Sequence, residues 1–143
     1  MADPRNTVTL EDVGAYSAQT YLIDNSTIVY SATVANGSAS VGLAVTVSAA
    51  KTVALTADGD AVLGKLIEVF ADNTASVKTG DYLTLGGGAS ATLTLGSAIV
   101  GALGASSAKG YIRSAASGTA AELIKCRGMI VDASDTTAVK VKV

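Results

Sequence analysis

Apolar and polar residues alternate with a period of two along most of this 143-residue chain, a pattern typical of strands with one buried face. Residues 27–34 (TIVYSATV) alternate in this way, and Asn36-Gly37 follows them at once. Asn-Gly favours the positive φ angles of a tight hairpin turn. We therefore predict a hairpin of strands 27–34 and 40–47. Residues 51–56 predict a further strand, which leads to a second turn at Asp58-Gly59.

Shorter alternating runs continue to the C-terminus. Residues 66–70 predict a strand, Asp72-Asn73 a turn, and the residues near Val77 a short strand. Residues 82–85 and 92–95 carry the same Leu-Thr alternation on either side of three glycines, which predicts a hairpin with a flexible tip. The remaining predicted strands are residues 98–102, 109–114, 123–132 and 136–143.

One segment allows two interpretations. Thr119 and Glu122 have the spacing of a capping box, and Gly128 could end a helix of two turns. Residues 123–132 (LIKCRGMIVD), which run past Gly128, can also be interpreted as a strand. The pattern alone leaves helix and strand open here.

The core must be built from small side chains. The chain is 49% hydrophobic, largely through Ala and Val, with one Phe, five Tyr and no Trp. Burial of apolar area stabilises a fold by about 25 cal/mol per Å², and small side chains bury less of it. Oligomerisation commonly compensates by covering further apolar surface. We therefore expect one mostly β domain of residues 21–143 that forms a homo-oligomer. Residues 1–20 show no clear period and predict an N-terminal arm.

Charge and hydropathy patterns argue against several partners. The net charge is −2 and lysine and arginine do not cluster, so nucleic acid is not an expected partner. Residues 25–50 and 82–108 lack charge but are broken by Gly, Ser and Thr, which argues against membrane spans. The polar N-terminus has no apolar core like that of a signal peptide, so we expect the chain to be made in the cytoplasm.

The residue types needed for most catalysis are missing. The chain has no histidine, which excludes imidazole bases and imidazole metal ligands. The aspartates at positions 58, 60, 72 and 81 are expected to serve turns. Residues 59–65 (GDAVLGK) have phosphate-loop spacing, but Leu66 replaces the required hydroxyl. Cys126, the only cysteine, is expected to be a buried, inert thiol. We predict no catalytic, metal or cofactor residue, and no enzymatic activity.

The segment from Gly59 to the C-terminus resembles the small capsid decoration, or cement, proteins of tailed bacteriophages. The likeness lies in SAIVGAL, KGYIRSAASGTAAE, RGMIVDAS and the terminal TTAVKVKV. It implies an all-β fold, a small β-barrel or β-tulip-like domain with an extended N-terminal arm. It also implies a homotrimer on the outer capsid surface of the virion, with the arm reaching onto the major capsid protein.

The arm contains a short alternating segment that could make this contact. Val8 and Leu10 are apolar and fall on one side of an extended chain, while Thr7 and Thr9 fall on the other. Such a segment can add a strand to an exposed sheet edge. The candidate capsid-binding residues are Thr7, Val8, Thr9, Leu10, Glu11 and Asp12.

Two alternatives stay open at this point. The chain could be another virion or surface structural module, such as a head fibre or a tail-tube subunit. It could also be a carbohydrate-binding or carbohydrate-acting protein that uses carboxylates and exposed tyrosines such as Tyr82 and Tyr111, although the low aromatic content counts against this.

Overall fold

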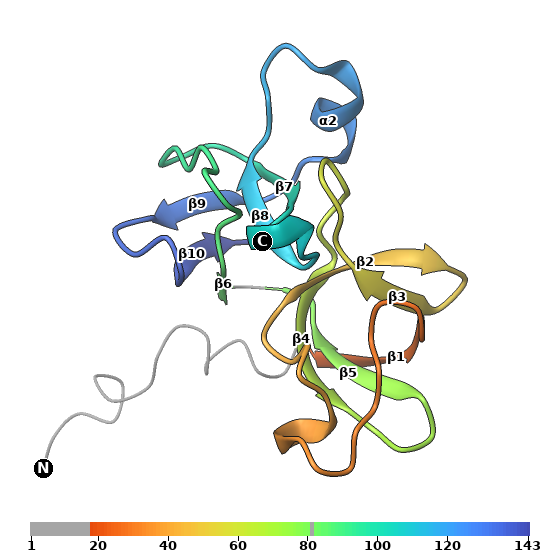
Figure 1. The fold of residues 1–143 in the computed structure, drawn as a ribbon. Coiled ribbons are helices and arrows are strands. Elements are labelled where there is room, and N and C mark those ends of the chain that lie inside the picture. Colours follow the sequence, from red (N-terminus) through yellow and green to blue (C-terminus); the bar gives the residue numbers. More distant parts are fainter. Residues whose placement is uncertain (1–17, 81) are drawn as a thin grey trace, which may run out of the picture.

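The computed structural model describes residues 18–80 and 82–143, which fold into two β lobes (Figure 1). The first lobe is a closed five-stranded barrel in the order β1-β3-β2-β4-β5. The second contains a three-stranded sheet, β6-β10-β9, and a two-stranded sheet, β7-β8. The prediction of an all-β fold with a small barrel is therefore confirmed.

The first strand closes the barrel. β1 pairs in parallel with β3 and antiparallel with β5, so that Leu22 lies opposite Thr52 on one side and Thr74 on the other. Leucine, isoleucine and valine side chains fill the interior, as the composition predicts. The barrel strands are β1 (Ala18–Ile23), β2 (Ala44–Ala49), β3 (Thr52–Leu55), β4 (Gly64–Val69) and β5 (Thr74–Lys78).

The second lobe has its own hydrophobic cluster, which Ala44 and Val62 extend toward the barrel. Because both lobes contribute to this cluster, they pack as one body. The elements of this lobe are β6 (Tyr82–Leu85), β7 (Ile99–Ala102), β8 (Tyr111–Ser114), α2 (Ala120–Lys125), β9 (Met129–Asp132) and β10 (Val139–Lys142). No helix among the described residues has the length and apolar character needed to cross a membrane.

The predicted hairpin around Asn36-Gly37 is wrong, although its turn is right. Both residues have positive φ, 57° and 84°, but they belong to a short 3-10 turn (η3, Ala35–Gly37) and residues 27–34 form no strand. The loop instead turns at Asp24, whose carbonyl accepts the Ile28 N–H at 2.9 Å. Ile28 is fully buried in the barrel core. The alternation did not produce a strand because this segment covers the barrel as a loop, with Ile28 buried in the core and Tyr30 packed against it.

The hairpin predicted across the three glycines is also wrong. β6 pairs with β10 near the C-terminus, and residues 92–95 form no strand. Gly87 and Gly88 donate backbone hydrogen bonds of 2.8 and 2.9 Å to Thr136 and Ile112. A Cβ on Gly88 would lie 2.8 Å from the Ala102 Cβ. These glycines are therefore packed where backbones approach closely, and they do not form a flexible tip.

Several boundaries differ from the prediction. β1 begins at Ala18, so residues 18–20 belong to the barrel and not to the arm. In the segment after Thr119, where the sequence allowed either a helix or a strand, α2 ends before Cys126. A strand shorter than the predicted one, β9, follows Gly128, which has a φ of 70°. Each interpretation is therefore correct for part of that segment. Cys126 is partly exposed where a buried thiol was predicted, and its thiol contacts the Leu123 carbonyl at 3.3 Å.

Candidate functional site

The turn aspartates bind their own backbone. Each of four carboxylates accepts a backbone N–H and a hydroxyl from the residue two positions later. These hydrogen bonds favour the ionised form and hold the pKa of each carboxyl below its ordinary value. The pairs are Asp24–Ser26, Asp72–Thr74, Asp132–Ser134 and Asp135–Thr137. The turn role predicted for Asp72 is thus confirmed.

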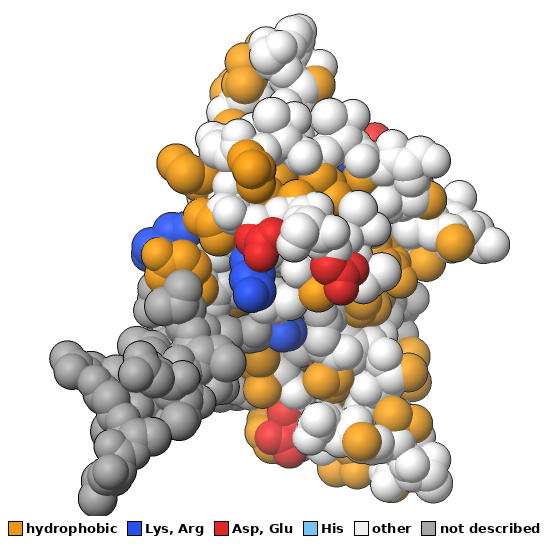
Figure 2. Space-filling view, turned by 90° about the vertical axis from the view of Figure 1, so that its left-hand side faces the viewer, with side chains coloured by type: hydrophobic (Ala, Val, Ile, Leu, Met, Phe, Trp, Pro, Cys, Tyr) orange, Lys and Arg blue, Asp and Glu red, His pale blue; other side chains and the backbone are white. Residues whose placement is uncertain are grey.

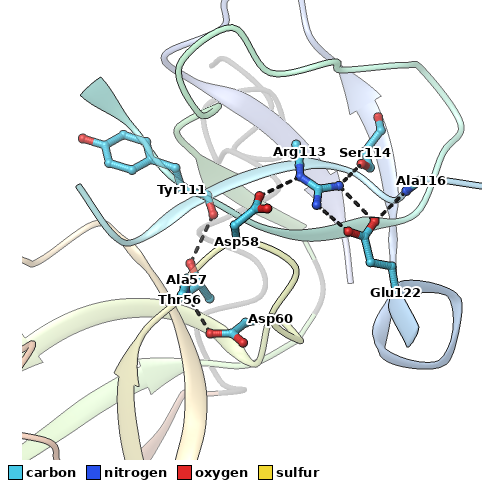
Figure 3. Close-up of polar contacts among 9 residues, drawn as sticks. All are labelled: Thr56, Ala57, Asp58, Asp60, Tyr111, Arg113, Ser114, Ala116 and Glu122. Carbon is cyan, nitrogen blue, oxygen red and sulfur yellow. Dashed lines mark hydrogen bonds and ion pairs between the residues drawn. The ribbon is translucent and has the colours of Figure 1, made fainter. Parts of the chain in front are cut away.

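The main charged cluster centres on Arg113 in β8 (Figure 3). Its Nε donates to Asp58 Oδ1 at 2.9 Å, and its two terminal nitrogens donate to the two oxygens of Glu122. Nη1 also donates to the Ser114 carbonyl at 3.1 Å. The Glu122 carboxylate additionally accepts the Ala116 N–H at 2.8 Å. The cluster therefore joins the turn after β3, strand β8 and helix α2.

The charges in this cluster satisfy one another. The hydrogen bonds from Arg113, with that from the Ala116 backbone, lower the pKa of Glu122 to about 2. The same carboxylates raise the pKa of Arg113, with Glu122 the larger cause. The side chains of Arg113 and Glu122 are only 20% and 14% exposed. A carboxylate held ionised in a bidentate ion pair is a poor proton donor, so this geometry anchors α2 and does not support acid–base catalysis.

Sequence reasoning missed this cluster. Glu122 was considered as a capping residue, but Thr119 makes no side-chain cap hydrogen bond and Glu122 binds Arg113 instead. Asp58 was assigned to a turn, and the separation of 55 residues between it and Arg113 gave no local signal. Only an explicit search for a partner of Arg113 could have suggested the pair.

The neighbouring polar groups also have structural partners (Figure 3). Asp60 Oδ2 accepts the Ala57 N–H at 2.9 Å, and the buried Thr56 hydroxyl donates to the Tyr111 carbonyl at 3.1 Å. The phosphate-loop lookalike continues from Gly64 into strand β4, where that motif requires a helix. Among the described residues, no group of three or more Cys, Asp or Glu side chains could hold a metal ion.

The two tyrosines named for the carbohydrate alternative lie in different settings. Tyr111 is packed against the backbone, since a Cβ on Gly104 would lie 2.6 Å from its ring. Tyr82 is in β6, and the Lys142 ammonium lies 5.5 Å from the centre of its ring.

The surface carries large apolar side chains on both lobes. Ile124 in α2 is 85% exposed and Leu95 is 65% exposed. Figure 2 shows hydrophobic side chains scattered over one face from top to bottom, with most of the visible charged side chains near its middle. The exposed large apolar residues are Leu22, Val29, Val34, Val47, Phe70, Leu95, Leu123, Ile124, Met129 and Val131.

An open depression of about 270 Å³ lies beside the loop that precedes η3. Tyr30, Val34 and Phe70 contribute apolar walls, and Glu68 is a carboxylate in its lining. The lining also includes the polar side chains of Ser31 and Asn36, and its exposed surface is more polar than apolar.

The candidate capsid-binding residues, Thr7 to Asp12, lie outside the described residues. Comparisons of the chain with protein families, with characterised proteins and with solved structures found no match.

Proposed function

We propose that the chain is a capsid decoration protein that binds the outer surface of a viral head and stabilises it by clamping subunits of the major capsid protein. This is a binding task that involves no catalysis. The family resemblance of the segment after Gly59 suggests it, and the character of the described surface supports it.

The observation that carries the proposal is the exposure of large apolar side chains on the surface of the fold, above all on α2. Leu123 and Ile124 are 51% and 85% exposed on α2, a helix that the Arg113–Glu122 ion pair holds in place. Exposed apolar groups that lie close together commonly mark protein contact sites. The carboxylate of Glu122 on the same helix, in contrast, is used within the fold. This combination suits a protein that works through contacts between subunits.

Self-association is part of the proposal. The largest fully buried side chains among the described residues are Ile, Leu and Val, without a buried aromatic ring. A core of this kind gains stability when further apolar surface is covered by neighbouring copies. We propose a homotrimer, in which several modest contacts with the head act together through a high effective concentration.

The arm supplies the proposed contact with the major capsid protein. Its candidate residues, Thr7 to Asp12, combine two apolar side chains with two carboxylates. Because β1 begins only at Ala18, deleting residues 2–15 should leave the barrel intact. Binding and folding can therefore be tested separately.

The experiment mixes purified protein with heads that lack it and images the particles by electron microscopy. The full chain should decorate the heads in regular positions and raise the temperature at which they release their contents. The chain lacking residues 2–15 should keep its β-type circular dichroism and bind heads much more weakly. Absence of decoration by the full chain would contradict the proposed function.

The number of copies of the chain per virion distinguishes a decoration protein from a fibre or tail subunit. A decoration protein should be close to equimolar with the major capsid protein in purified virions, as measured by quantitative mass spectrometry. A far lower copy number would favour the alternative.

A further inference from the structure

The outer face of the β6-β10-β9 sheet is a mixed apolar and basic surface. The inner face is buried through Leu83, Ile130 and Val141. Alternation then places the residues between them on the outer face. The pairing register sets Lys142 beside both Tyr82 and Met129. The register shifts between Lys140 and Val141, so that Asp132 lies opposite Lys140. The outer face consists of Tyr82, Thr84, Met129, Val131, Asp132, Lys140 and Lys142.

Its apolar part is well exposed. Met129 and Val131 are 49% and 42% exposed, and Leu95 is 65% exposed. Leu95 lies next to β9, because the Gly96 N–H donates to the Ile130 carbonyl at 2.8 Å. Figure 2 looks at the side of the molecule where β9 and β10 lie in Figure 1, and it shows basic side chains beside hydrophobic ones.

Its charge complements another part of the same chain. Residues 82–143 contain six basic and three acidic residues, whereas residues 1–17 contain three acidic residues and one arginine. Within the arm, the apolar Val8 and Leu10 stand directly before Glu11 and Asp12. An extended segment of this composition fits a face on which Met129 and Val131 lie beside two lysines and one aspartate, Asp132, which leaves the face with a net positive charge.

The arm also leaves the barrel close to this face. Ala18, the first residue of β1, lies opposite Lys78. The chain reaches Tyr82 only four residues after Lys78, which bounds the separation at about 14 Å. Asp12 is six residues before Ala18, a reach of about 20 Å. A face of three four-residue strands is about 13 Å long and 10 Å across, so the segment can reach it within one molecule.

We propose that residues 7–12 dock on the outer face of the β6-β10-β9 sheet of the same chain, with Val8 and Leu10 over Met129 and Val131 and the two carboxylates near Lys140. The proposal goes beyond the proposed function, since it concerns the free protein and holds whether or not the chain binds a head. If the major capsid protein also binds residues 7–12, it must compete for them with the outer face of the β6-β10-β9 sheet.

Paramagnetic relaxation in solution tests the contact. The full chain carrying Cys126→Ala and Thr9→Cys is labelled with a nitroxide at the introduced thiol, and the broadening of backbone amide signals is measured. We expect strong broadening over 129–132 and 139–142 and little over the β2-β3 hairpin. Dilution should not change the pattern. Val131→Ser with Lys140→Glu should abolish the broadening.

Val47→Ser with Lys51→Glu is the matched control, because it makes the same two changes at exposed positions of the barrel and should leave the broadening unchanged. Retained amide shifts of the barrel core show that each variant is folded. Broadening that spares the sheet face, or that survives Val131→Ser with Lys140→Glu, overturns the proposal. So does broadening seen only when nitroxide-labelled chains are mixed with separate isotope-labelled chains, since the occupant would then be the arm of a neighbouring copy.

Discussion

Ile28 and Val29 are neighbours in a loop that covers the barrel, yet they should differ sharply in their contribution to stability. Ile28 is fully buried, and Val29 is 63% exposed. Ile28→Ala removes three carbon atoms, each contributing about 0.8 kcal/mol through burial, which gives about 2.4 kcal/mol. The cavity left behind raises the expected loss to about 3–4 kcal/mol, within the range of about 2–5 kcal/mol for such changes.

Val29→Ala should change stability by no more than about 0.5 kcal/mol, as exposed substitutions usually do. Urea unfolding followed by circular dichroism measures both variants, at one protein concentration because oligomers unfold in a concentration-dependent way. The expected result is a large fall in the midpoint for Ile28→Ala alone. Equal midpoints for the two variants would show that the loop does not anchor its side chain in the barrel.

Three further predictions follow from particular contacts. Gly88→Ala should destabilise the protein by about 1–3 kcal/mol in urea unfolding because the new Cβ meets Ala102 at 2.8 Å, whereas Gly118→Ala, with nothing within 4 Å, should be neutral or slightly stabilising. Glu122→Gln should lower stability near neutral pH. Arg113 lowers the pKa of Glu122 from 4.5 to about 2, so the ion pair contributes fully to the free energy of unfolding above pH 4.5. The difference in free energy of unfolding between wild type and variant should shrink as the pH falls toward 2. A difference that stays the same at low pH would contradict this prediction. Cys126→Ser should leave oligomerisation unchanged in size-exclusion chromatography with light scattering, since the partly exposed thiol contacts only a backbone carbonyl; a change in oligomer size would show that the thiol has a further role.

Local patterns predicted the strands whose alternation is enforced by burial on one face. Residues 52–55, 74–78, 99–102 and 111–114 all form strands close to the predicted positions. Turn chemistry was equally informative, since Asn73 adopts a φ of 63° at the turn between β4 and β5. Short-range steric preferences act on these residues whatever the rest of the chain does.

Pairing between distant segments was not predictable in the same way. Leu83 and Leu93 carry the same local pattern, but Leu83 pairs with Val141 in β10 while Leu93 only packs against the core without strand structure. Arg113 and Asp58, 55 residues apart, meet because the two lobes pack. Which strand pairs with which depends on the pairing that buries more surface, and that buried surface is a property of the complete fold. The contacts proposed for Thr7 to Asp12 remain predictions.

The closure of the barrel by β1 has a consequence for the order of assembly during synthesis. β1 is the first barrel strand to leave the ribosome, but its partner β5 ends only at Lys78. The β2-β3 and β4-β5 pairs connect nearby residues and can form early, because short loops close at little entropic cost. We therefore expect that β1 cannot pair with β5 until some 60 further residues have emerged from the ribosome. Closure of the barrel by this pairing should then be a late step. Any chaperone or neighbouring nascent chain that captures an unpaired strand has its opportunity in that interval.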